Sequence, residues 1–250
     1  QTLDWAVDYL KKDESVKAQK GAEVIQKLLE HDGLKSEEVD NYLSLLVERY
    51  NNANGDLRSE LIDSMAGICA QSVYKNRASK LFKPLFEKAL GNENDLIRES
   101  AVDGLIYIDK TNALVLLRQG FYDDKNGRIR EKVIKLAEEV GGESDIGWLS
   151  SKLAGTNGNS IVWQTMFKIF KGFNSEQLSK HGFKVLNSTG DKLSFEQKAG
   201  LLELLKQKAS AEEKYDILTA ASVRLADAYA KKGDFKLAFG TIAETRKISE

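Results

Sequence analysis

The sequence contains very little proline, cysteine and histidine, and each scarcity excludes a class of structure or site. Pro84 is the one proline among 250 residues, whereas chains rich in turns and flexible linkers carry many more, and proline disrupts helix interiors. Cys69 is the one cysteine, which excludes an internal disulfide and a cysteine-based zinc cluster. His31 and His181 lie far apart in the sequence, and neither has a neighbour at the spacing of a metal site. We expect no metal and no cofactor.

Long apolar runs and an excess of charge are also missing. No stretch approaches 18 consecutive apolar residues, so we expect no membrane span, and no secretory signal is present. Because the chain opens with Gln1 rather than Met, it is either processed or cut from a longer polypeptide, and its compartment stays open. The 37 basic and 38 acidic side chains give a net charge of -1, which argues against a dedicated nucleic-acid binder.

What is present favours helix throughout. Leu, Ala, Lys and Glu are abundant, apolar residues recur with a helical period almost everywhere, and no sustained alternation typical of a strand occurs. We therefore predict a soluble all-α protein whose short helices are joined by polar turns. The predicted helices span residues 3–11, 15–30, 36–51, 56–73, 77–90, 95–108, 111–121, 127–140, 144–154, 159–171, 175–186, 194–208, 211–231 and 235–248.

Part of this pattern is an internal repeat. The stretch "NDLIRESAVDGLIYI" aligns with the later stretch "NGRIREKVIKLAEEV", which superposes Ile97 on Ile129 and Arg98 on Arg130. An apolar helix precedes each copy, so the repeated unit is a helix, a polar turn and a second helix. One such hairpin cannot bury its own apolar face, and neighbouring hairpins must stack to complete a core. The repeat predicts an α-solenoid.

Two further segments extend the repeat. Another step of the same length reaches "SIVWQTMFKIF", where the alignment predicts Ile161 in the core and replaces the arginine by Val162. Upstream, "GDLRSELIDSMAGI" carries the same pattern with Arg58. The solenoid is therefore predicted to include these two helices as well.

The stretch "LFKPLFEKALGNENDLIRESAVDGLIYI" resembles a HEAT repeat, with a proline in the first helix and a turn aspartate followed by an aliphatic residue and arginine. The resemblance is clearest over residues 77–140 and extends to 36–70 and 144–171. In HEAT families the turn Asp or Asn and the following arginine commonly form a ladder between units. The resemblance therefore implies a structural role for Arg58, Arg98 and Arg130.

The C-terminal part resembles a different family. "SVRLADAYAKKGDFKLAFGTIAETRKI", residues 222–248, is similar to one tetratricopeptide repeat, with the small residues Ala226 and Ala238 where its two helices approach closely. The loop-like stretch "NSTGDKLS" precedes this part of the chain. We predict a HEAT-like solenoid over residues 1–187 and a helical C-terminal segment over residues 188–250.

The sequence offers no catalytic constellation. A glycine-framed serine, a Cys–His grouping and a phosphate-binding loop are all missing. Acidic pairs such as Asp123–Asp124 fall in turns or on exposed helix faces, where carboxylates stabilise helix starts. We predict that the chain is not an enzyme.

The strongest functional signal is a pair of aromatic residues. The repeat alignment places Trp163 and Phe167 at positions predicted to face solvent, and their i,i+4 spacing puts them on one helix face. Two interpretations stay open: they anchor a partner at the inner wall, or later helices cover them. The predicted contact surface on the second helices comprises Trp163, Phe167, Glu131, Lys135, Asp103 and Glu99.

These observations predict a non-catalytic scaffold or interaction module that binds a protein or peptide on its concave face and belongs to a larger protein. Two alternatives remain. One is an accessory domain of an enzyme whose catalytic part lies outside these residues. The other is a nucleic-acid-associated HEAT-like protein, whose phosphate-binding stripe would be Arg98, Arg128, Arg130, Lys132 and Lys135.

Overall fold

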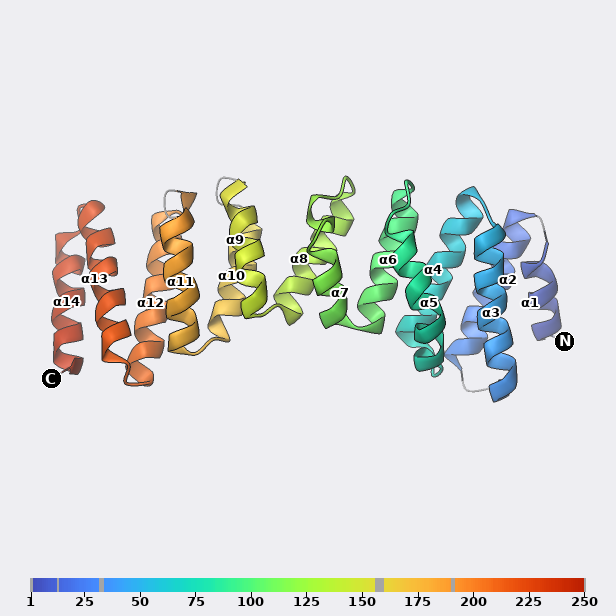
Figure 1. The fold of residues 1–250 in the computed structure, drawn as a ribbon, viewed down its shortest axis with the longest axis horizontal. Helices are drawn as coiled ribbons and strands as arrows, with labels where there is room; N and C mark the ends of the chain where they lie inside the picture. Colours follow the sequence, from blue (N-terminus) through green and yellow to red (C-terminus); the bar gives the residue numbers. More distant parts are fainter. Residues whose placement is uncertain (1, 13, 32–33, 156–159, 190–191, 250) are drawn as a thin grey trace. The chain divides into compact units, whose positions relative to one another are not determined.

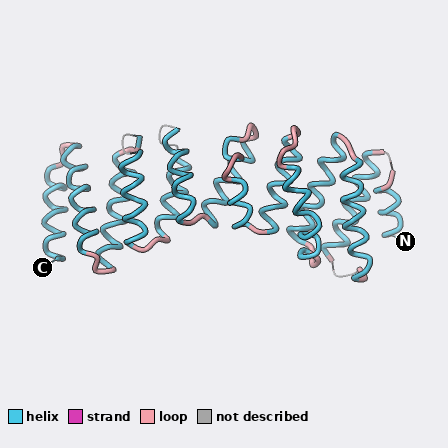
Figure 2. Tube along the Cα trace, viewed as in Figure 1, coloured by secondary structure: helices cyan, strands magenta, loops and turns pink. Residues whose placement is uncertain are grey.

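The computed structural model describes residues 2–12, 14–31, 34–155, 160–189 and 192–249. Within these ranges the chain consists of fourteen α-helices, two short 3-10 helices and connecting loops, with no strand (Figure 2). These helices confirm the all-α prediction. The physical reason is that the apolar residues keep a helical period in nearly every segment. The chain divides into two compact units, Gln1–Leu136 and Ala137–Glu250, and each is described by itself.

In the first unit the even-numbered helices pack in one row, α2 on α4 and α4 on α6, while α3 packs on α5. The hairpins α1–α2, α3–α4 and α5–α6 are closed by contacts between their two helices. The main contacts of a helix are therefore with the next one and the next but one. The elements are α1 (Thr2–Leu10), α2 (Ser15–Glu30), α3 (Ser36–Asn52), α4 (Gly55–Gln71), α5 (Lys75–Ala89), α6 (Asp95–Ile108), α7 (Lys110–Leu117), η1 (Phe121–Asp123) and α8 (Gly127–Val140), which continues into the second unit (Figure 1).

The second unit follows the same rule. Helix α9 packs on α11 and α11 on α13, α10 packs on α12, and α13 contacts both α12 and α14. The elements are η2 (Glu143–Asp145), α9 (Ile146–Gly155), α10 (Ser160–Lys171), α11 (Ser175–Thr189), α12 (Phe195–Ala211), α13 (Tyr215–Lys231) and α14 (Phe235–Ser249).

Burial of one position in α10 corrects the repeat alignment. Ile97 and Ile129 are buried, as predicted, but Ile161 is 51% exposed, and Val162 is fully buried instead. Moving the alignment by one position superposes four buried residues of α10 on four buried residues of α8: Val162 on Ile129, Met166 on Val133, Ile169 on Leu136 and Phe170 on Ala137. The extra residue falls in the stretch between these helices, part of which lies outside the described residues. In the corrected alignment Trp163, not Val162, stands at the position of the repeat arginines.

The predicted loop "NSTGDKLS" is shorter than expected, because α11 continues to Thr189. Helix α11 also packs against both α12 and α13, so helices on the two sides of the predicted boundary contact one another. The compact units meet instead at residues 136 and 137, inside α8. The division by repeat type into residues 1–187 and 188–250 stays a prediction.

Candidate functional site

An arginine binds the carbonyl groups of the turn that precedes α6. Arg98 Nη1 donates to the backbone oxygens of Asn92 and Glu93, each at 3.0 Å. The side chain of Asn92 accepts a hydrogen bond from Asn94 N at 2.9 Å, and Asn94 caps the helix by accepting from Leu96 N. The arginine therefore closes a turn whose own side chains already fix the start of the helix.

The turn before α8 repeats this arrangement. Arg130 Nη1 donates to the backbone oxygens of Asp124 and Lys125. Asp124 Oδ1 accepts from Asn126 N at 2.8 Å, and Asn126 caps α8 by accepting from Arg128 N at 2.9 Å. The sequence repeat thus corresponds to a repeated set of hydrogen bonds.

The two turns are also connected to each other. Arg98 binds Asp124 through two hydrogen bonds, of 2.8 Å and 3.0 Å, and the two side chains are only 12% and 8% exposed. This arginine lowers the pKa of Asp124, and the carboxylate raises the pKa of Arg98. Asn126 reaches back to Glu99 at 3.4 Å. Arg98 and Asp124 therefore fix the spacing between consecutive helical hairpins in the first unit.

Arg58, the third residue of the predicted ladder, is placed differently. Its guanidinium lies 4.6 Å from the ring centroid of Tyr50, and its buried Nε has no hydrogen-bond partner. Arg98 of α6 is held by Asp124, which lies in the turn before α8. The equivalent position in the turn before α6, which Arg58 of α4 would reach, is the neutral Asn92, so Arg58 has no such acid. Arg58 is a stacking residue in this structure.

An acidic groove of about 230 Å³ lies along α4 and α6, at the face where the repeat places its polar residues. The alignment that superposes Arg58 on Arg98 also superposes Asp63 on Asp103, so both helices bring an aspartate to the same face. Sequence reasoning found Glu99 and Asp103 but missed the acids of α4, for which this alignment was the signal. The groove is lined by Ser59, Glu60, Asp63, Leu96, Glu99, Ser100, Asp103 and Arg128.

Lys132 partly neutralises this groove. Its Nζ lies 2.6 Å from Asp103 Oδ2 and 2.9 Å from Glu99 Oε1. Burial nevertheless raises the pKa of Asp103 above its ordinary value, and the nearby charges of Glu99 and Asp63 raise it further, against the opposing effect of Lys132. Glu60 and Asp63 are exposed. The groove therefore presents excess negative charge to solvent.

The remaining predicted contact residues do not join this groove. Glu131 and Lys135 are exposed on α8. Trp163 is only 8% exposed, so the interpretation of an exposed Trp163 is wrong and the alternative, burial, applies. Phe167 is partly buried, and its ring lies 4.0 Å from the position of a Cβ added to Gly200 on α12. The rings of Trp163 and Phe167 stack with centroids 6.0 Å apart.

A comparison with protein-family models and a comparison with curated proteins each found no match to this chain.

The described helices include none that is long and apolar enough to cross a bilayer. Within the same residues, no group of three or more histidine, cysteine, aspartate or glutamate side chains could hold a metal ion. Cys69 is buried, which raises the pKa of its thiol to about 11.

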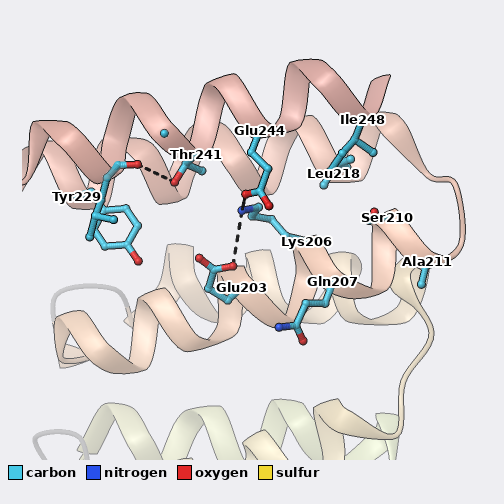
Figure 3. A pocket seen from close by; sticks show the side chains of 12 residues that line it. Glu203, Lys206, Gln207, Ser210, Ala211, Leu218, Tyr229, Thr241, Glu244 and Ile248 are labelled. Atoms are coloured by element: carbon cyan, nitrogen blue, oxygen red, sulfur yellow. Dashed lines mark hydrogen bonds and ion pairs between the residues drawn. The ribbon is translucent and has the colours of Figure 1, made fainter. Parts of the chain in front are cut away.

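A second groove, of about 570 Å³, lies between α12 and α14. Figure 3 shows Lys206 on its wall between two glutamates, with Nζ 3.1 Å from Glu244 and 3.6 Å from Glu203. The lysine is only 8% exposed as a residue. Sequence reasoning gave no signal for this ion-paired lysine, because the three residues come from two helices that are not consecutive in the chain.

Proposed function

We propose that the chain is a non-catalytic scaffold that binds a basic segment of a partner protein in the acidic groove along α4 and α6. The observation that carries the proposal is the excess of carboxylates there: four line the groove, and Lys132 and Arg128 only partly offset their charge. A lysine or arginine of a partner would reach Glu60 and Asp63, both exposed. Such complementary charges mainly give specificity and fast association.

We propose further that the units form an α-solenoid of HEAT-like hairpins with a tetratricopeptide-like hairpin at the C-terminus. Contacts mainly between successive and next-but-one helices support this architecture. So do the turns before α6 and α8, in which equivalent arginines bind equivalent carbonyl groups. In such a solenoid the groove would lie on the wall formed by the second helix of each hairpin.

The nucleic-acid alternative is disfavoured by the contacts of the basic residues. Arg98 is bound to Asp124, and Arg130 binds carbonyl groups of its own turn. Lys132 is paired with two carboxylates. A phosphate backbone would have to displace these contacts next to an acidic groove. The accessory-domain alternative is compatible with the same groove, which would then bind a basic segment of the enzyme.

The test is binding of two short peptides of equal length, one rich in Lys and Arg and one rich in Asp and Glu, measured by fluorescence anisotropy at low ionic strength. We expect binding of the basic peptide alone, weakened by salt. Asp63→Lys should weaken it about tenfold. The matched control Glu48→Lys makes the same charge change at an exposed position of α3 and should leave affinity nearly unchanged. Equal losses in both variants, or no binding, would reject the groove.

A further inference from the structure

A third groove, of about 550 Å³, lies in the second unit along α11, α12 and α13 (Figure 1). Each helix lines it with residues three or four positions apart, which share one helix face. Helix α11 packs on both other helices, so packed helices bound the groove. We call it the basic groove, because four basic side chains and one acidic side chain line it: Lys198, Arg224, Lys231, Lys232 and Asp227.

Two of these four cations already have carboxylate partners. The ion pairs, of 2.7 Å and 3.6 Å, are Lys231–Asp227 and Lys232–Glu196. Within the described residues, neither Arg224 nor Lys198 pairs with a carboxylate. The positive charge that a ligand would meet is therefore mainly that of Arg224 and Lys198.

Arg224 is oriented by two contacts with α11. Its guanidinium lies 4.5 Å from the ring centroid of Phe183, and its Nη1 donates to Asn187 Oδ1 at 2.9 Å. Neither partner carries a charge, and the bond to Asn187 uses one of the five N–H donors of the guanidinium. A guanidinium oriented by a ring and an amide is arranged in advance to bind a carboxylate.

The basic groove also has an apolar part. Leu186, Phe195, Leu202 and Ala228 line it beside the cations. Leu202 is 3% exposed, and the other three are partly buried. This apolar surface is small, so one aliphatic side chain of a ligand would cover it, whereas a ligand made only of charged groups would leave it in water.

The aromatic rings beside the basic groove do not favour nucleic acid. A cation already lies over each ring, Arg224 over Phe183 and Lys232 over Phe195, the latter at 4.1 Å from the ring centroid. Proteins that bind single strands use such rings to stack bases. Asp227 would also repel a phosphate backbone that follows the groove. A protein segment with carboxylates suits these contacts better.

We propose that the basic groove binds a segment of a partner protein in which an aliphatic side chain lies beside Asp or Glu. A carboxylate of the segment binds Arg224 and Lys198, and the aliphatic side chain covers Leu186 and Leu202. A segment of acids alone lacks the apolar contact and does not bind measurably. The basic groove and the acidic groove share no residue, so this proposal goes beyond the function proposed above and does not rest on it.

Fluorescence anisotropy with two labelled peptides of equal length tests the basic groove. One peptide has a central leucine flanked by glutamates, and the other has serine in place of that leucine. We expect the leucine peptide to bind and the serine peptide to bind about tenfold more weakly or less, because it loses the burial of one aliphatic side chain. Lys198→Glu should weaken binding of the leucine peptide about tenfold. The matched control Lys80→Glu makes the same charge change at an exposed position of α5 and should leave affinity nearly unchanged.

A second variant keeps the test independent of folding. Arg224→Gln removes the other cation from an exposed position and should also weaken binding of the leucine peptide, while thermal melts followed by circular dichroism compare each variant with wild type. No binding of the leucine peptide, equal affinity for both peptides, or equal losses in Lys198→Glu and Lys80→Glu would overturn the proposal. So would a single-stranded oligonucleotide that binds more tightly than the leucine peptide and loses affinity in Lys198→Glu, because the groove would then belong to nucleic acid.

Discussion

Replacing Trp163 by alanine tests the corrected register of α10. Trp163 is 8% exposed and stacks on Phe167, so truncation removes a large buried ring and leaves a cavity. Such substitutions cost about 3–5 kcal/mol of the free energy of unfolding. Ile161, two positions earlier, is 51% exposed. Its truncation to alanine should cost about 1 kcal/mol or less, since about half of the side chain is already in water.

Urea denaturation followed by far-ultraviolet circular dichroism measures both variants at one protein concentration. The comparison is internal, because the two residues lie in the same helix and both changes produce alanine, a good helix former. The uncorrected alignment, which superposes Ile161 on Ile129, expects the opposite order, with Ile161 in the core and Trp163 in solvent. A cost for Ile161→Ala equal to or larger than that for Trp163→Ala would refute the burial argument and the corrected alignment, in which Trp163 takes the position of the repeat arginines.

Two further predictions concern ion pairs. Asp124→Asn should lower the free energy of unfolding by about 2–3 kcal/mol in urea titrations, because it leaves the largely buried Arg98 without its charged partner; a loss below about 0.5 kcal/mol would contradict the proposed link between turns. Lys180 and His181 lower the pKa of Glu143 from 4.5 to about 2. Because the folded-state pKa is depressed, the stabilisation is full above about pH 4.5 and is lost as pH falls through about 2. Glu143→Gln should therefore melt below wild type at pH 7 and at the same temperature near pH 2, and a pH-independent difference would argue against a charge effect.

Most of the fold was predictable, because helix formation depends on a local period. The apolar spacing in "NDLIRESAVDGLIYI" and the capping Asn94 determine both the existence and the start of α6, and the predicted range 95–108 is the observed one. Neither feature depends on distant residues. The same reasoning predicted the other helices, with errors mainly at their ends.

The register of α10 was not predictable in this way. A one-residue change in the connection before the helix rotates every later position by about 100°. Both alignments leave apolar residues at helical spacing, because α10 is apolar on most of its surface, with Ile161, Val162 and Trp163 in succession. Packing against α9 and α12 then decides which of these residues is buried, and no pattern within the helix contains that information.

The candidate site was predictable in part for a related reason. Glu99 and Asp103 could be placed on the second-helix face from the period of α6, and α8 supplies Lys132 from the next hairpin. The repeat step from α4 to α6 is longer than the step from α6 to α8, so an alignment restricted to the shorter step does not bring Asp63 beside Asp103. Predicting all the acids of the groove from the sequence therefore requires both repeat steps, the longer one from α4 to α6 and the shorter one from α6 to α8.

Lys132 also limits how the acidic groove can work. Its ammonium group already satisfies Glu99 and Asp103, with contacts of 2.9 Å and 2.6 Å, so a basic residue of a partner would either displace it or bind the more exposed Glu60 and Asp63. Displacement would break the two ion pairs of Lys132 and so cancel much of the gain. Binding to the exposed acids adds one cation to a cluster of four carboxylates that Lys132 and Arg128 offset only in part. For the proposed basic segment the second arrangement is therefore the favoured one, and such a partner would associate fast and dissociate easily in salt.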